Sequence, residues 1–154
     1  MTPSGVHIRE ARFGEEQQIL DMYEWLFQPP GARPPGFRPG HALQAIGETL
    51  ADRDATILLA VERDSRIGLC SIYLDLNSIR FGRRAWVEDL AVDPERRSAG
   101  VGHALMDAAR AWGSEHGATH LELDSGETRT DAHRFYERES PSWRSNQYSW
   151  LLDP

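Results

Sequence analysis

The sequence has few of the features that mark secreted or membrane-spanning proteins. Its single cysteine, Cys70, cannot form an internal disulfide, and its apolar, strand-like surroundings favour a small core residue over a nucleophile. No apolar run approaches the roughly 18 residues that a membrane span needs. The N-terminus also lacks a basic segment followed by an apolar one. We therefore expect a soluble, cytoplasmic protein without a membrane partner.

The charge balance and the histidines argue against two further kinds of partner. The formal net charge is −7, and the arginines are scattered rather than clustered, which argues against a nucleic acid partner. An acidic surface attracts cations, so a small amine suits this protein better than an acidic metabolite. His116 and His120 are four residues apart, but Gly117 interrupts the helix that would bring them together. We therefore expect no metal site.

The length and the hydrophobic pattern predict one compact domain over residues 1–154. The chain is 40% hydrophobic, which is enough for one core, and it contains no internal repeat. The pattern predicts strands over 6–12, 56–62, 67–76, 85–92, 120–124 and 147–152, and helices over 15–27, 41–50, 131–139 and from the glycines near 100 to those near 113. A loop rich in proline and glycine, 28–40, separates the first two helices.

The most informative segment runs from Val87 to Gly102. It reads as a buried strand, ended near Pro94, that leads into a glycine-bearing loop and then a helix. The free N–H groups of a helix N-terminus bind phosphate well, and Gly100 and Gly102 let a ligand approach the main chain. The segment is neither a P-loop, which needs Lys and Ser/Thr after the glycines, nor a complete dinucleotide fingerprint.

Two motifs resemble the GCN5-related N-acetyltransferase (GNAT) family. Arg97-x-x-Gly100-x-Gly102, after a strand ending Leu-Ala-Val, resembles the family's acyl-CoA pyrophosphate motif, and the segment from Ala132 to Tyr136 resembles its later A-x-x-F-Y helix. The resemblance covers nearly the whole chain. It implies an α/β (α+β) fold in which a central mixed, twisted sheet carries helices on both faces. Its two central parallel strands, 85–92 and 120–124, would splay apart to hold acetyl-CoA.

The resemblance also assigns the cofactor contacts. The pantetheine of acetyl-CoA would pair with main-chain groups of the strand end, and the pyrophosphate would lie on the loop and the helix start. Arg129 stands where much of the family has an asparagine that contacts CoA, and we carry that contact over to it. The predicted contacts are Leu90, Ala91, Val92, Arg97, Ser98, Ala99, Gly100, Val101, Gly102, His103 and Arg129.

Two residues carry the predicted chemistry. By resemblance, Tyr136 is the general acid that protonates the departing CoA thiolate. Glu88 is the candidate general base, because its strand resembles that of polyamine and glucosamine-phosphate acetyltransferases. A second interpretation of Glu88, in which it only binds a cationic substrate or pairs with an arginine, stays open. Strand alternation predicts that Glu88 faces the same way as Trp86 and Leu90, with Asp89 on the opposite face.

The predicted function is therefore transfer of an acetyl group from acetyl-CoA to a primary amine in a ternary complex. The preferred acceptor is a small molecule such as a polyamine, an amino sugar or an aminoglycoside. One alternative is acetylation of protein lysines or N-termini, and another is a sensor that binds acyl-CoA without turnover. Dimers are common among such folds, and the sequence leaves a homodimer open. After the tyrosine helix, Pro141 and Trp143 replace the family's usual glycine and aromatic, so the last strand is the least certain element.

Overall fold

The computed structural model describes residues 2–154, which form two compact units. The first unit covers residues 2–123 and the second covers residues 124–154. Each is described by itself below. In the described residues no helix has the length and apolar character needed to cross a membrane.

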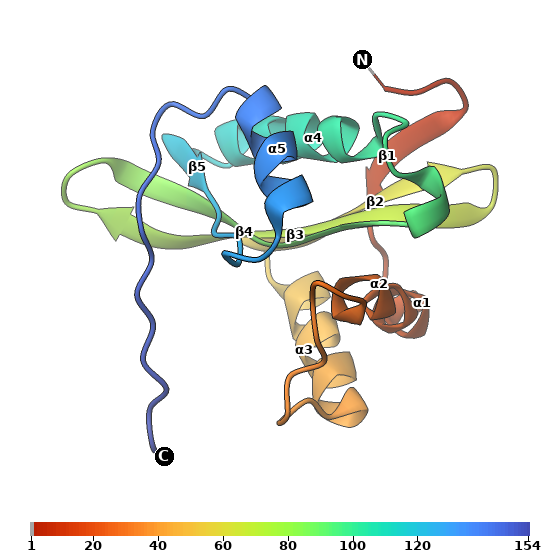
Figure 1. Cartoon of the computed structure of the whole chain (residues 1–154), viewed down its shortest axis with the longest axis horizontal. Coiled ribbons are helices and arrows are strands. Elements are labelled where there is room, and N and C mark those ends of the chain that lie inside the picture. The colour runs from red at the N-terminus through yellow and green to blue at the C-terminus, as the bar shows by residue number, and fades with distance from the viewer. Residues whose placement is uncertain (1) are drawn as a thin grey trace. The chain divides into compact units, whose positions relative to one another are not determined.

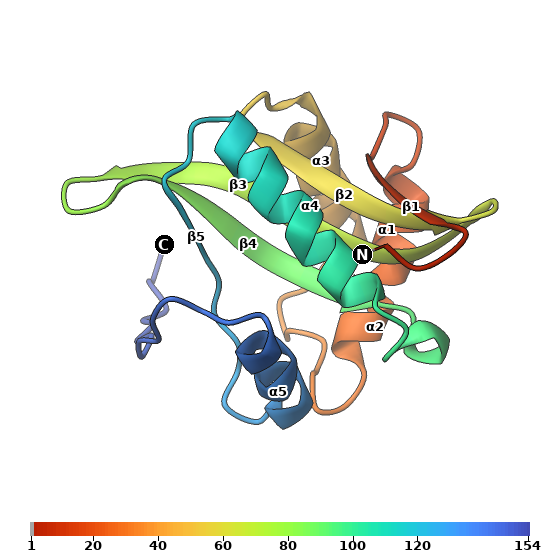
Figure 2. The same ribbon diagram turned by 90° about the horizontal axis from the view of Figure 1, so that it is seen from above.

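The first unit is built on a five-stranded sheet (Figure 1). Its strands are β1 (Val6–Glu10), β2 (Ala55–Glu62), β3 (Ser65–Ser78), β4 (Gly82–Val92) and β5 (His120–Glu122). They lie in sequence order, with antiparallel pairs from β1 to β4 and a parallel pair between β4 and β5. This mixed sheet confirms the predicted fold class. The β3 and β4 hairpin is longer than the sequence pattern predicted and extends past the other strands (Figure 2).

Helices cover both faces of this sheet (Figures 1 and 2). On one face lies α4 (Val101–Glu115); on the other lie α1 (Glu16–Met22), the short α2 (Glu24–Phe27) and α3 (Pro39–Ala51). Strand β2 shows why the sequence folds this way. Leu58 and Ala60 pack on the α4 side, whereas Ile57 and Leu59 pack on the α1 side. A strand buried on both faces needs the continuous apolar run that β2 has.

The predicted helix over 15–27 is divided at one residue. Tyr23 ends α1 and begins α2, and its N–H donates to Leu20 O over 3.1 Å. The side chain of Tyr23 packs against the core on the α1 side of the sheet. The division therefore places Tyr23 at the junction of the two helices, with helical backbone angles.

Strands β4 and β5 are paired over only a short stretch. The pairing runs from Arg84 with His120 to Trp86 with Glu122, although β4 continues to Val92. Among residues 2–123, the β4 edge beyond Trp86 has no ladder to β5. The two strands therefore separate after three residue pairs, as the splayed arrangement requires.

A β-bulge lies where this separation begins. Opposite β3, Ser71 pairs with Asp89 and Ile72 pairs with Val87, so Glu88 is an extra residue in β4. A bulge of this kind disrupts the ladder locally and redirects the side chains that follow. Strand alternation, on which the sequence prediction rested, therefore fails at this point.

The second unit contains α5 (Thr130–Arg138) and an extended C-terminal segment. The predicted strand over 147–152 is wrong, because the described residues after α5 form no regular element. Tyr148, Trp150 and Leu152 alternate as in a strand, but they are exposed. Within residues 124–154 no other strand is present to pair with this segment. Alternation alone was an insufficient signal.

Candidate active site

The N-terminus of α4 has the geometry of an anion-binding turn. The chain passes through a short 3₁₀ helix (Pro94–Arg96) and then takes positive φ angles at Ser98 (64°) and Gly100 (86°) before α4 begins. Within α4 the N–H of Ala104 donates to Gly100 O over 3.1 Å, so the N–H groups of Val101 and Gly102 precede the helical ladder. The positive end of the dipole of a 15-residue helix adds to the attraction for a phosphate.

Gly100 suits this turn for two reasons. Its φ of 86° is strained for any residue with a side chain, and an added Cβ would meet Pro3 Cγ at 3.4 Å. Val101, the next residue, is buried against the sheet and fixes the start of the helix. Residues 97–100 are all exposed. Val101 thus anchors the turn to the sheet, and residues 97–100 stay open to solvent, which fits binding of a pyrophosphate.

The free edge of β4 offers main-chain groups beside this turn. The N–H of Asp93 donates to Ile67 O over 2.9 Å, so Asp93 is hydrogen-bonded to β3. In an antiparallel pair these bonds fall on every second residue. The main-chain groups of Leu90 and Val92 therefore point away from β3, towards the edge that β5 leaves unpaired. This geometry fits the pantetheine contacts predicted for them.

Glu88 is exposed on the bulge and is held by two neutral donors. Trp86 Nε1 donates to Glu88 Oε2 over 2.7 Å, and the Tyr73 hydroxyl donates to the same oxygen over 3.2 Å. Burial, followed by the charge of Glu88, raises the pKa of Tyr73 to about 12. The Tyr73 hydroxyl therefore stays a donor at neutral pH. Within residues 2–123 Glu88 forms no ion pair with an arginine or a histidine, and its role stays a prediction.

Asp89 lies on the same face of the sheet as Glu88, not on the opposite one. Its Oδ2 accepts from the Tyr23 hydroxyl over 2.8 Å, and Tyr23 packs on the α1 side, the side on which Trp86 and Tyr73 also lie. Leu90, predicted to share the face of Glu88, packs on the α4 side instead. The bulge is the physical reason for both corrections, because one extra residue shifts the alternation by one.

Arg84 fastens the strands just before they separate. Its guanidinium donates to Asp75 on β3 over 2.9 and 2.5 Å and to Glu122 on β5 over 2.9 Å. It also lies 4.8 Å from the ring centroid of Trp86. The hydrogen bonds with Asp75 raise the pKa of Arg84 further above its ordinary value. A permanent cation thus joins β3, β4 and β5 where β4 and β5 are still paired.

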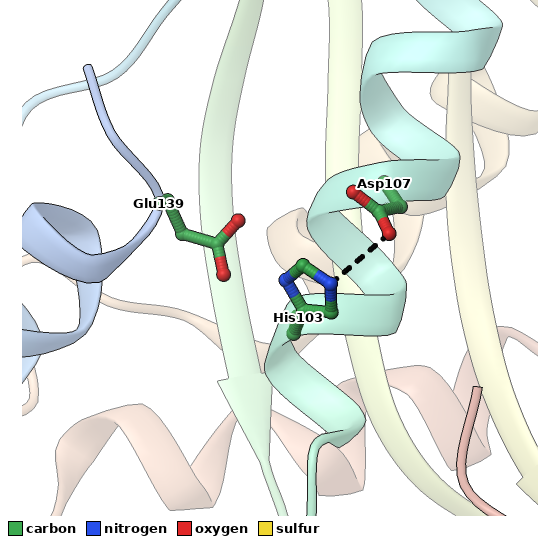
Figure 3. A group of neighbouring side chains, drawn as sticks. All are labelled: His103, Asp107 and Glu139. Atoms are coloured by element: carbon green, nitrogen blue, oxygen red, sulfur yellow. Dashed lines mark ion pairs between the residues drawn. The ribbon is translucent and has the colours of Figure 1, made fainter. Parts of the chain in front are cut away.

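The side chain of His103 interacts along α4. Its Nε2 lies 3.2 Å from Asp107 Oδ2, one helical turn later (Figure 3). Asp107 also accepts from Arg110 over 2.8 Å. We therefore expect His103 to contribute to the anion turn through its main chain.

The second unit carries the remaining predicted residues. Tyr136 lies on α5, with its ring centroid 5.2 Å from that of Phe135 in an edge-to-face arrangement. Arg129 is the N-cap residue of α5, and its N–H donates to Gly126 O over 3.0 Å. The imidazole of His133 is also 2.9 Å from Gly126 O. The proton-donor role of Tyr136 and the CoA contact of Arg129 stay predictions.

Sequence reasoning missed the residues that hold the two carboxylates. Tyr73 and Ser71 come from β3, and Tyr23 comes from the junction of two helices, 66 positions before Asp89. No local motif connects these positions. A sequence-based search could only have looked for an aromatic or hydroxyl residue on β3 opposite Glu88 and Asp89. That position depends on how β3 and β4 pair, and the pairing could not be predicted before the length of their hairpin was known.

Comparisons with known proteins identify the family of this chain. The model of the acetyltransferase (GNAT) family matches residues 17–140, so the chain belongs to that family. An uncharacterized N-acetyltransferase of Bacillus subtilis (strain 168), YhdJ, is 34% identical over 89 residues, which are 58% of this chain and 63% of that protein. The aminoglycoside N(6')-acetyltransferase type 1 of Stenotrophomonas maltophilia is 28% identical over 95 residues, covering 59% and 62% of the two chains.

The matches therefore span less than two thirds of the length of these relatives. Solved structures resemble the fold over a longer stretch. The aminoglycoside N-acetyltransferase AAC(6')-Iy, in complex with CoA, superimposes with a TM-score of 0.83 at 16% identity and covers 99% of both chains. At that identity the likeness shows the fold alone, and it confirms the predicted architecture.

Proposed function

We propose that this chain is an N-acetyltransferase that moves the acetyl group of acetyl-CoA to a primary amine of a small molecule. The observation that carries the proposal is the end of β4. There a bulge exposes Glu88, the free strand edge exposes main-chain groups at Leu90 and Val92, and the N-terminus of α4 opens to solvent. A proton acceptor, a carbonyl-polarising edge and a phosphate-binding turn thus follow one another within 15 residues.

In this mechanism the neutral amine attacks the acetyl carbonyl carbon. Glu88, directly or through a water, takes the proton that the nitrogen loses as the new C–N bond forms. The N–H of Leu90 polarises the carbonyl oxygen as charge develops on it. The C–S bond then breaks, and Tyr136 donates its hydroxyl proton to the departing thiolate. The products are an amide and free CoA.

Several features support a small amine as acceptor. Glu88 and Asp89 share one face of the sheet, so a cation is attracted to the place where the amine must lie. The loop 28–38, which follows α2 in sequence, is folded on itself. Arg33 lies 5.0 and 5.1 Å from the ring centroids of Phe27 and Phe37 and pairs with Glu24. The relative from Stenotrophomonas maltophilia is named for an aminoglycoside. An aminoglycoside-like polyamine is therefore the first acceptor to try.

The family match reaches into both compact units, since it covers residues 17–140. This supports the proposal that residues 1–154 act as one acetyltransferase domain.

The test is release of CoA, measured with a thiol-reactive dye. Acetyl-CoA would be offered with aminoglycosides, polyamines, amino sugars, amino acids and lysine peptides, and calorimetry would follow CoA binding in parallel. The chain contains no lysine, so mass spectrometry of the reaction is free of acetylation at lysine side chains of the enzyme itself. Turnover with a small amine supports the proposal, turnover with lysine peptides alone replaces the substrate class, and CoA binding without turnover favours a sensor. Absence of CoA binding overturns the proposal.

A further inference from the structure

Tyr23 connects the helices on one face of the sheet to the bulge in β4. It occupies the junction between α1 and α2, its ring packs on the core beneath these helices, and its hydroxyl donates to Asp89 Oδ2 over 2.8 Å. Asp89 is held a second time, because its N–H donates to the hydroxyl of buried Ser71 over 3.1 Å. Both the side chain and the main chain of the residue after Glu88 are thus fixed by hydroxyl groups.

The bulge needs such support for electrostatic and geometric reasons. An extra residue interrupts the ladder, so the main chain there loses regular hydrogen bonds. The same extra residue brings two consecutive carboxylates to one face, where like charges repel. A hydroxyl that donates to Asp89 offsets part of this repulsion and fixes the direction in which that carboxylate points. Glu88 is then left facing its own donors, Trp86 and Tyr73.

Tyr23 stays a donor over the whole working pH range. Burial, together with the negative charge of Asp89, raises its pKa well above the ordinary value of 10.0. The Ser71 hydroxyl acts against this rise without reversing it. The phenol therefore stays protonated, and a donor to Asp89, at neutral pH.

We infer that Tyr23 is a positioning residue for acetyl transfer: by holding Asp89, its hydroxyl fixes the β4 bulge so that Glu88 faces the acceptor amine and the following N–H groups face the acetyl carbonyl. The inference rests on the proposed function for its activity readout. It assigns Asp89 a geometric role and leaves proton transfer to Glu88.

The experiment compares Tyr23→Phe with the unaltered protein, with Tyr148→Phe as control, because Tyr148 is exposed and remote in sequence from the bulge. The Phe ring keeps the packing and removes only the hydroxyl. We expect kcat to fall about tenfold to a hundredfold, as small displacements at a reacting centre do. The Kd for CoA should stay within about twofold, because the pyrophosphate turn at α4 is untouched. Amide hydrogen exchange should accelerate in the peptide covering residues 86–92.

Two variants of Asp89 keep the test decisive even if Tyr23→Phe folds poorly. Asp89→Asn still accepts a hydrogen bond from Tyr23, so it should retain most of the turnover and the slow exchange. Asp89→Ala removes the acceptor and should reproduce the Tyr23→Phe effects. The double variant Tyr23→Phe/Asp89→Ala should lose no more turnover than either single variant.

The outcomes separate this inference from the proposed function. If no amine is acetylated by the unaltered protein, the proposed function fails, but the exchange rates still test the contact. Unchanged exchange in both Tyr23→Phe and Asp89→Ala overturns the inference. So does a loss of turnover in Asp89→Asn as large as in Asp89→Ala, because Asp89 would then act through its charge.

Discussion

Two glutamates of the first unit have opposite surroundings. Glu15, at the start of α1, is only 7% exposed and accepts from Arg9 over 2.9 and 2.6 Å, from Arg66 over 2.9 and 2.6 Å, and from the N–H of Arg12 over 2.7 Å. Glu88 is exposed on β4, and within residues 2–123 it accepts from neutral donors, Trp86 and Tyr73. One carboxylate is enclosed by cations, whereas the other is paired with no cation of the first unit.

The difference distinguishes a structural carboxylate, Glu15, from the proposed catalytic one, Glu88. Arg9 lies on β1 and Arg66 on β3, so Glu15 ties two strands to a helix. Both carboxylate oxygens of Glu15 already accept hydrogen bonds from these groups, so Glu15 is not available to bind a ligand. Neutral donors orient Glu88 without neutralising it, so its charge remains available for a cationic amine and its oxygen for a proton. A carboxylate on a strand is therefore best judged by the charge of its partners.

The largest expected effect is on stability, in Glu15→Gln. Glutamine has the same shape but no charge, so two partly buried guanidinium groups lose their anion. Breaking a buried ion pair in this way costs about 3 kcal/mol or more. Urea unfolding should show the loss, while kcat measured on the folded fraction stays unchanged. Glu115→Gln, on the exposed end of α4, is the matched control. An equally stable Glu15→Gln protein would contradict the structural role.

Acid should weaken the same contact. The hydrogen bonds with Arg9 lower the pKa of Glu15 from its ordinary 4.5 to about 2. A lowered folded pKa means that the stabilisation is complete above pH 4.5 and is lost as the pH falls towards 2. A shift of this size is worth roughly 3 kcal/mol. Unfolding free energies of the unaltered protein and of Glu15→Gln should therefore converge over that window. A constant difference down to pH 2 would disprove the linkage.

Glu88→Gln should show the reverse pattern. Within residues 2–123 its charge pairs with no cation, so the thermal midpoint should stay the same within the error. Removing a general base typically costs about a hundredfold in kcat, and the Kd for CoA should not change. Steady-state kinetics with the best amine of the panel, together with calorimetry, test this. A rise in KM for the amine with unchanged kcat would instead support the interpretation that Glu88 only binds a cationic substrate.

The outcome for these carboxylates shows how far sequence reasoning reaches. The strand, the turn and α4 were readable because Pro94, Gly100 and the apolar face of α4 are local signals. The direction of Asp89 was not, because a one-residue bulge leaves no mark in the local pattern and depends on the register with β3. Likewise, the alternation of residues 147–152 predicted a strand that the structure does not form.

The smallest expected effect concerns a phenol rather than a carboxylate. Tyr136→Phe removes the proposed proton donor to the CoA thiolate but keeps the ring beside Phe135. Turnover should fall about tenfold or somewhat more, because a thiolate is a tolerable leaving group without a proton. The CoA Kd and the thermal midpoint should be unchanged. Tyr136 would then resemble Glu88, whose loss affects turnover, and not Glu15, whose loss affects stability. If kcat and CoA affinity fell together, Tyr136 would be a binding residue, and water would be left as the proton source at the sulfur.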